Sequence, residues 1–141
     1  MQVILNLKEK LLEEKLLELA KIQRSMQDAR AKQTDLENYK SEINEALVAV
    51  YQSGNELNLN EIQRYKDFTN KLIVDISNQK VVIKNIAKVL EIKRNEVNEI
   101  LKEKKVLEKL KEKQQKMYYL DFERSQRKEL DDITSSRYHI A

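Results

Sequence analysis

The features that most limit what this chain of 141 residues can fold into are its single glycine, Gly54, and the complete absence of proline. Glycine is the usual residue where a helix ends in a left-handed turn, and proline is the strongest helix breaker. Just beyond Gly54, Asn58 can cap a new helix, with Glu61 three residues later completing a capping box. The sequence therefore predicts one turn, at residues 53–58, between two long helices.

The composition agrees with long helices. Hydrophobic residues make up 40% of the chain, charged residues 36% and aromatic residues 6%. Such a profile without glycine or proline is typical of coiled coils, whereas a compact domain of this length needs many turns. The 27 basic and 24 acidic residues leave a net charge of only +3, which fits a solvated helix surface better than a nucleic-acid-binding patch. We expect one extended all-α domain over residues 1–141.

Heptad repeats of apolar residues flank the predicted turn. Before it, eight of ten a and d positions are apolar: Leu19, Ile22, Met26, Ala29, Gln33, Leu36, Lys40, Ile43, Leu47 and Val50. After it, ten of fourteen are apolar: Ile62, Tyr65, Thr69, Leu72, Ile76, Gln79, Ile83, Ile86, Leu90, Lys93, Val97, Ile100, Lys104 and Leu107. These repeats predict an antiparallel two-helix coiled-coil hairpin with a common buried seam.

The heptad register before Leu19 is left open by the pattern. Leu5 and Leu12 keep the a spacing, but Lys8 and Lys15 stand at d. Several further leucines widen the apolar stripe in this part of the chain instead of repeating at d.

The two predicted helices have unequal lengths, because the first covers about residues 3–52 and the second about residues 59–137. A hairpin folded about residue 55 would leave the second helix unpaired beyond about residue 111. An unpaired helix that still carries apolar residues usually binds another molecule.

The residues for catalysis and for cofactor binding are missing from this sequence. His139 is the only histidine, there is no cysteine, and one glycine cannot form a phosphate-binding loop. We expect no enzyme activity, no cofactor, no metal site and no small-molecule substrate. No window approaches the roughly 18 uncharged residues that a membrane span needs, so we expect a cytoplasmic protein whose membrane contact is peripheral.

The stretch that follows the turn holds a first candidate for partner binding. Phe68 falls at position g, beside the seam, and Leu72 falls at d four residues later. Phe68 either widens the seam close to the turn or forms an exposed aromatic anchor for another protein. Further apolar residues lie outside the a and d positions and favour a partner or self-association: Ile73, Val74, Val81, Val82 and Val89.

The C-terminal segment is the second candidate. Residues 102–128 contain ten Lys or Arg against five Asp or Glu. Apolar residues lie within and after them: Met117, Tyr118, Leu120, Phe122, Leu130 and Ile133. Nucleic acid is one possible ligand, but Asp121 and Glu123 interrupt the positive stripe and no DNA-binding motif surrounds it. A helix that docks into a cavity of another protein explains the apolar residues better.

Two motifs in this chain resemble the FliJ family of flagellar type III export proteins. The first is Tyr65-x-x-Phe68-x-x-x-Leu72 just after the turn. The second is the basic, glutamine-containing run from Glu123 to Ile133, which ends in Lys-x-Leu-Asp-Asp-Ile. The resemblance covers nearly the whole chain in length and layout.

The resemblance implies a coiled coil like the central stalk of rotary ATPases, located at the flagellar base and peripheral to the inner membrane. It implies three partners, namely the hexameric export ATPase, the membrane export gate and the export chaperones. Phe68 and Leu72 match the family's gate-binding pair. The residues that match the terminal motif would face the ATPase ring: Arg124, Arg127, Lys128, Leu130, Asp131 and Ile133.

Two alternatives remain open at this point. The chain could be a structural or adaptor coiled coil that simply oligomerises. It could also be the equivalent stalk of a virulence-type secretion system, which a coiled-coil pattern separates poorly from a flagellar one.

Overall fold

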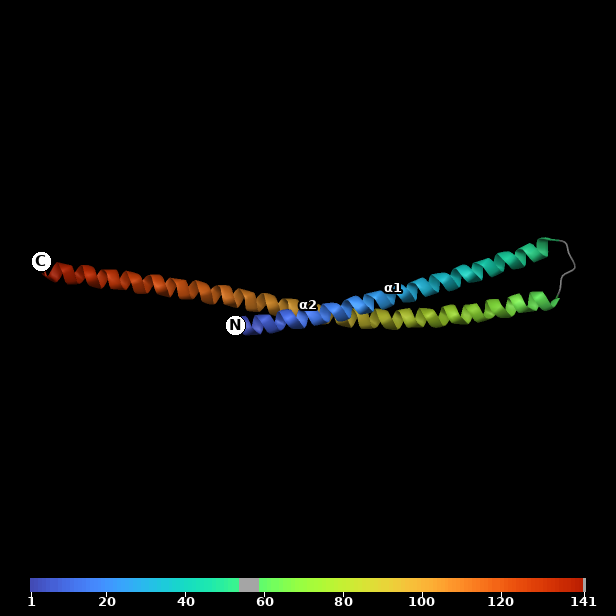
Figure 1. Ribbon diagram of the computed structural model, residues 1–141, viewed down its shortest axis with the longest axis horizontal. Helices are drawn as coiled ribbons and strands as arrows, with labels where there is room; N and C mark the ends of the chain where they lie inside the picture. The colour runs from blue at the N-terminus through green and yellow to red at the C-terminus, as the bar shows by residue number, and fades with distance from the viewer. Residues whose placement is uncertain (54–58, 141) are drawn as a thin grey trace. The chain divides into compact units, whose positions relative to one another are not determined.

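Two long α-helices make up the described part of the chain (Figure 1). The computed structural model describes residues 1–53 and 59–140, with side chains as far as residue 137. Helix α1 spans Gln2–Gln52 and helix α2 spans Leu59–Ile140. The prediction of an all-α hairpin with two unequal helices is confirmed, and α2 continues three residues further than predicted.

Local hydrogen bonding accounts for the end of α1. The Ser53 hydroxyl donates to the Val50 carbonyl oxygen at 2.9 Å, which satisfies one of the last-turn carbonyls that a helix leaves unpaired. Helix α2 carries the acidic Glu61 in its first turn, where the helix dipole favours a negative charge. The turn and capping residues predicted from the sequence, Gly54 and Asn58, lie outside the described residues.

The chain divides into two compact units. Residues 15–96 form the first, here called the central unit, and residues 1–14 with 97–141 form the second, here called the terminal unit. In the central unit Lys15 of α1 contacts Glu96 of α2, and Tyr39 contacts Phe68. Residue numbers rise along α1 while those of their partners fall along α2, so the two helices of this unit are antiparallel.

The terminal unit shows the same antiparallel order. The Lys111 ammonium donates to the Gln2 side-chain oxygen, and the Lys8 ammonium forms an ion pair with Glu103. Within the described part of this unit, α2 makes no hydrogen bond or ion pair to α1 beyond Lys111. Residues 112–137 of α2 are exposed apart from the half-buried Glu123.

The heptad seam is the core of both units. All twenty-four a and d positions predicted from the sequence are buried or half-buried. Buried apolar members are Met26, Ala29, Ile43, Ile62, Leu72 and Ile76 in the central unit, and Leu5, Val97 and Ile100 in the terminal unit. Among the described residues no side chain is completely shielded from solvent, because a two-helix seam is open along both sides.

The open question about the register before Leu19 has a clear answer. Leu5 is buried at position a, and Lys8, Leu12 and Lys15 are half-buried. The same heptad register therefore continues to the start of α1, with two lysines at d. Lysine can occupy such a position because its aliphatic stem packs along the seam while its ammonium reaches a partner at the edge.

Candidate partner-binding surfaces

Phe68 lies on the side of the seam in the central unit, where it packs against Tyr39 of the opposite helix. The two ring centroids are 5.8 Å apart with an interplanar angle of 68°, an edge-to-face contact. Both residues stand at position g of their helices, and 45% of the Phe68 surface remains exposed. Phe68 thus widens the seam, as the first interpretation from the sequence expects, and its half-exposed ring leaves the second, an anchor for another protein, as a prediction.

Leu72, the second residue of the pair, has a different environment. Only 4% of its surface is exposed, whereas its neighbour Ile73 is 46% exposed. Leu72 is therefore a core residue of the seam. A partner that docks on the folded central unit can contact Phe68 directly, whereas Leu72 is enclosed in the seam.

A shallow hollow of about 290 Å³ lies beside Phe68. The other residues that line it are Tyr39, Ile43, Glu61, Arg64 and Tyr65. Aromatic side chains and an arginine are the residue types that most often anchor a protein–protein contact. The hollow therefore enlarges the candidate surface from one phenylalanine to a cluster contributed by both helices.

The six C-terminal residues that match the terminal motif all lie on α2 in the terminal unit and are exposed: Arg124, Arg127, Lys128, Leu130, Asp131 and Ile133. None of their side chains forms an ion pair or a hydrogen bond within the described part of the chain. Leu130 and Ile133 are 63% and 53% exposed. These side chains are free to contact another molecule.

Four apolar residues of this segment follow a line of their own, whereas Met117, Tyr118 and Leu120 lie outside it. Continued along α2, the heptad register of the seam would pass through Tyr118, Asp121 and Ser125. The apolar line consists of Tyr119, Phe122, Leu130 and Ile133; three of them stand one residue after a seam position, and Leu130 stands two residues after one. At 3.6 residues per turn these four lie within about 80° of arc on one helix face, and all are exposed. The end of α2 is therefore not patterned as a continuation of the seam.

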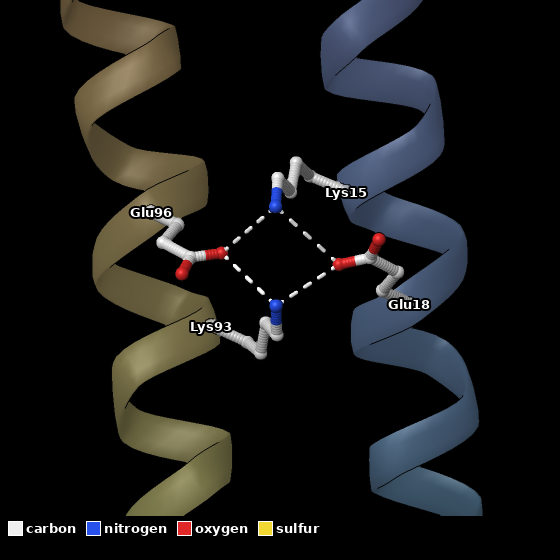
Figure 2. A network of polar contacts seen from close by, with 4 residues as sticks. All are labelled: Lys15, Glu18, Lys93 and Glu96. Carbon is white, nitrogen blue, oxygen red and sulfur yellow. Dashed lines mark hydrogen bonds and ion pairs between the residues drawn. The ribbon is translucent and has the colours of Figure 1, made fainter.

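A ring of four charged side chains joins the two helices of the central unit (Figure 2). The Lys15 Nζ lies 3.5 Å from Glu18 Oε2 and 3.2 Å from Glu96 Oε2. The Lys93 Nζ lies 3.1 Å from Glu18 Oε2 and 3.3 Å from Glu96 Oε2. Each ammonium is shared between the two helices, so the ring closes across the seam. We refer to these four residues as the charged ring.

The charged ring shifts the pKa values of three of its members, Glu18, Glu96 and Lys93, in the directions that keep them ionised. The hydrogen bond from Lys93 lowers the pKa of Glu18, and the charge of Lys15 adds to the effect. The hydrogen bond from Lys15, and then that from Lys93, lowers the pKa of Glu96. The pKa of Lys93 is raised by its hydrogen bond to Glu18 and then by that to Glu96. These shifts favour the ionised forms of the two glutamates and of Lys93.

A buried amide forms a second polar link in the central unit. Gln79 stands at a d position and is 7% exposed, and its side-chain nitrogen donates to the Ala29 carbonyl oxygen at 2.8 Å. The methyl side chain of Ala29 leaves room for the amide to reach the backbone of α1. A buried polar group of this kind is tolerated because its hydrogen bond is made.

A further lysine in the seam lies in the terminal unit. Lys104 stands at a, and its Nζ is 3.7 Å from Glu9 Oε1 and 3.9 Å from Glu108 Oε1. These are long, partly exposed pairs, and each contributes at most about 1 kcal/mol. The two carboxylates give the Lys104 ammonium partners of opposite charge but add little to the stability of the fold.

Sequence reasoning missed the charged ring and the role of Tyr39. A signal for the ring was present, because the pattern Lys-x-x-Glu occurs in both helices with lysine at d and glutamate at g, at residues 15–18 and 93–96. Tyr39 carried a weaker signal, namely an aromatic residue at g. Which g residue it meets depends on how the two helices are aligned.

Neither helix contains, among the described residues, a stretch long and apolar enough to cross a membrane. Within residues 1–53 and 59–137, whose side chains the structure describes, no three carboxylate side chains gather as they do around a metal ion. The surfaces described above are instead suited to contacts between proteins, since they combine exposed apolar residues with charged groups on long helices.

Comparison with known proteins identifies a family. A search of curated proteins and a search of solved structures found no match. The family model described as flagellar FliJ protein matches residues 1–140, which is nearly the whole chain. The resemblance in the two motifs is thus extended to a match over both helices, and the chain belongs to the family of flagellar FliJ proteins, which is associated with flagellar protein export.

Proposed function

We propose that this protein is a non-enzymatic stalk of the flagellar type III export apparatus, which binds the export ATPase ring through the C-terminal segment of α2. The observation that carries this proposal is the exposed apolar line Tyr119, Phe122, Leu130 and Ile133, which no part of α1 covers within the described terminal unit. The match to the FliJ family supplies the apparatus in which such a surface would work. It also favours a flagellar over a virulence-type system.

The charged residues around this line suit a part that moves against its partner. Arg124, Arg127, Lys128 and Asp131 are exposed and make no ion pair among the described residues. Exposed ion pairs contribute only about 0–1 kcal/mol each. Contacts of this strength hold a helix end in a ring and let it exchange partners between subunits.

A second contact, to the membrane export gate, belongs to the same proposal. Phe68 and the hollow beside it form the gate-binding surface, and Leu72 supports that surface from within the seam. Through the gate the protein would lie at the cytoplasmic face of the inner membrane. The resemblance also implies that the protein escorts export chaperones, and we assign no surface to them.

Hydrolysis of ATP by the cognate export ATPase tests the main proposal. Its rate is measured alone, with the full chain, and with a chain that ends at Lys111. We expect the full chain to raise the rate and the truncated chain to have no effect. In a finer version Phe122→Ser with Ile133→Ser abolishes the stimulation, whereas Val3→Ser, which alters an exposed apolar residue of α1, leaves it intact. Equal stimulation by the full and the truncated chain would refute the assignment of this segment.

A structural or adaptor role is the second candidate, and one observation favours it. Several apolar residues of α2 in the central unit remain exposed outside the seam, and five of them lie within about 100° of arc on one helix face: Val74, Val81, Val82, Val89 and Ile92. Such a stripe can bind a second copy of the chain. Sedimentation over a hundredfold range of concentration separates the two candidates, because the adaptor role requires association and a monomer at all concentrations excludes it.

A further inference from the structure

The apolar seam by itself does not define how the two helices are aligned. Its a and d residues recur every seven positions on both helices. A slide of α2 by one heptad, about 10 Å at 1.5 Å per residue, would again place apolar residues against apolar residues. The five residues between Ser53 and Leu59 could span roughly 17 Å when extended, so the length of the connection does not exclude such a slide.

The charged ring, in contrast, can form in one alignment only. Lys93 lies between the helices beside Glu18. Seven residues from Glu18 along α1 stand Leu11 in one direction and Ser25 in the other. A slide of one heptad in either direction therefore leaves the Lys93 ammonium at a d position without its carboxylate on α1.

The Gln79–Ala29 hydrogen bond selects the same alignment for a different reason. It requires a small side chain opposite Gln79, so that the amide can reach a backbone carbonyl. One heptad away from Ala29 stand Ile22 and Leu36. Either side chain would fill the space that the amide occupies and leave a buried polar group unpaired, which is strongly unfavourable.

We propose that the charged ring and the Gln79–Ala29 hydrogen bond act together as a register key, which holds α1 and α2 in one alignment and excludes the alignments displaced by one heptad. A single polar residue at a seam position is known to specify register in coiled coils. Here two unlike polar links, separated along the central unit, select the same alignment. The key thereby determines which residues of α2 are left uncovered by α1. This inference does not depend on the proposed export function.

A distance measurement between spin labels tests the register key. The chain has no cysteine, so cysteines introduced at the exposed positions Ala20 and Asn70 are labelled selectively. Because Glu18 lies beside Lys93 in the antiparallel pair, Ala20 is level with about residue 91 of α2. Asn70 therefore lies about 30 Å from Ala20 along the helix axis, at 1.5 Å per residue. A slide of one heptad changes this distance to about 20 or about 40 Å.

The decisive variant replaces the key by apolar residues. The labelled chain carries Lys15→Leu, Lys93→Leu and Gln79→Leu together. Dilution with an excess of unlabelled chain suppresses the distances between labels on different molecules. We expect a second distance population displaced by about 10 Å. The matched control, Lys21→Leu, Lys88→Leu and Gln27→Leu, makes the same changes at exposed positions and should keep a single population. A single population near 30 Å in the apolar variant would overturn the proposal.

A second pair of variants covers the case in which the apolar variant is not helical. Reversing all four charges (Lys15→Glu, Glu18→Lys, Lys93→Glu and Glu96→Lys) preserves a closed ring, so we expect one distance. Lys93→Glu alone places three carboxylates around one lysine, so we expect a broadened or displaced distribution. Identical distributions in these two variants would refute the role of the ring.

Discussion

Replacement of Leu72 by alanine distinguishes the role of Leu72 from that of Phe68, the other residue of the proposed gate-binding pair. Leu72 is 4% exposed in the seam of the central unit. Its truncation removes about three methylene equivalents, each contributing about 0.8 kcal/mol, and leaves a cavity besides. We expect a loss of about 2.5–3 kcal/mol in the free energy of unfolding, near the lower end for buried leucines because the seam is open to solvent on both sides. For a chain of this length this lowers the melting temperature on the order of 10 °C.

The adjacent residue supplies the control. Ile73 has nearly the same side-chain volume but is 46% exposed, so Ile73→Ala should reduce the free energy of unfolding by less than about 1 kcal/mol. Thermal unfolding of both variants is followed by far-ultraviolet circular dichroism. If Leu72→Ala melts at the same temperature as Ile73→Ala, Leu72 does not lie in the seam and the heptad assignment of α2 is wrong.

Phe68→Ala completes this experiment. Phe68→Ala removes the edge-to-face contact with Tyr39, which contributes about 0.5–1.5 kcal/mol beyond the apolar area that the ring buries, so we expect the free energy of unfolding to fall by at least that amount. If Phe68 contacts the gate directly, its removal should weaken binding to the soluble part of the gate at least tenfold, about 1.4 kcal/mol. Leu72→Ala, measured well below its melting temperature, should bind nearly as tightly as the unchanged chain. Equal losses in both folded variants would contradict the division of roles.

Three further predictions concern stability. A chain that ends at Lys111 should melt within a few degrees of the full chain, measured by circular dichroism, because no hydrogen bond or ion pair joins α1 to the described residues beyond it. The pKa values of Glu18 and Glu96 are lowered, so their contribution to the free energy of unfolding is complete above about pH 4.5, the ordinary carboxyl range, and is lost as the pH falls through the lowered values. Replacing both by glutamine should therefore make the melting temperature depend less on pH between pH 5 and about pH 2. Ala29→Leu should reduce the free energy of unfolding in urea by about 1–3 kcal/mol, because it overpacks the seam and displaces the Gln79 amide.

The polar positions of the seam reflect a compromise between stability and alignment. Lys15, Lys93 and Gln79 occupy places where leucine would bury more apolar surface. Replacing buried ionic groups by apolar residues is often neutral or stabilising. The retention of these two lysines and one glutamine is understandable if a defined alignment matters more to the protein than maximal stability, as the register key requires.

Much of the candidate site could be predicted from single-helix patterns. The heptad spacing placed Leu72 at d and Phe68 at g, and the structure has Leu72 buried and Phe68 half exposed. The exposure of Leu130 and Ile133 also follows from a segment that continues past the start of α1. The contact of Tyr39 with Phe68 could not be predicted, because both lie beside the seam and their meeting depends on the alignment of two helices.

The sequence by itself determined that the chain forms two long helices on either side of one interruption, and which residues of each helix enter the seam. These properties are local, because helix breakers act where they stand and a heptad repeat selects one face of its own helix. Only the tertiary structure decided which residues meet across the seam, such as Lys15 with Glu96 and Gln79 with Ala29. A periodic seam permits several alignments with nearly equal apolar contact, so the partners of each polar side chain are defined only when both helices are in place.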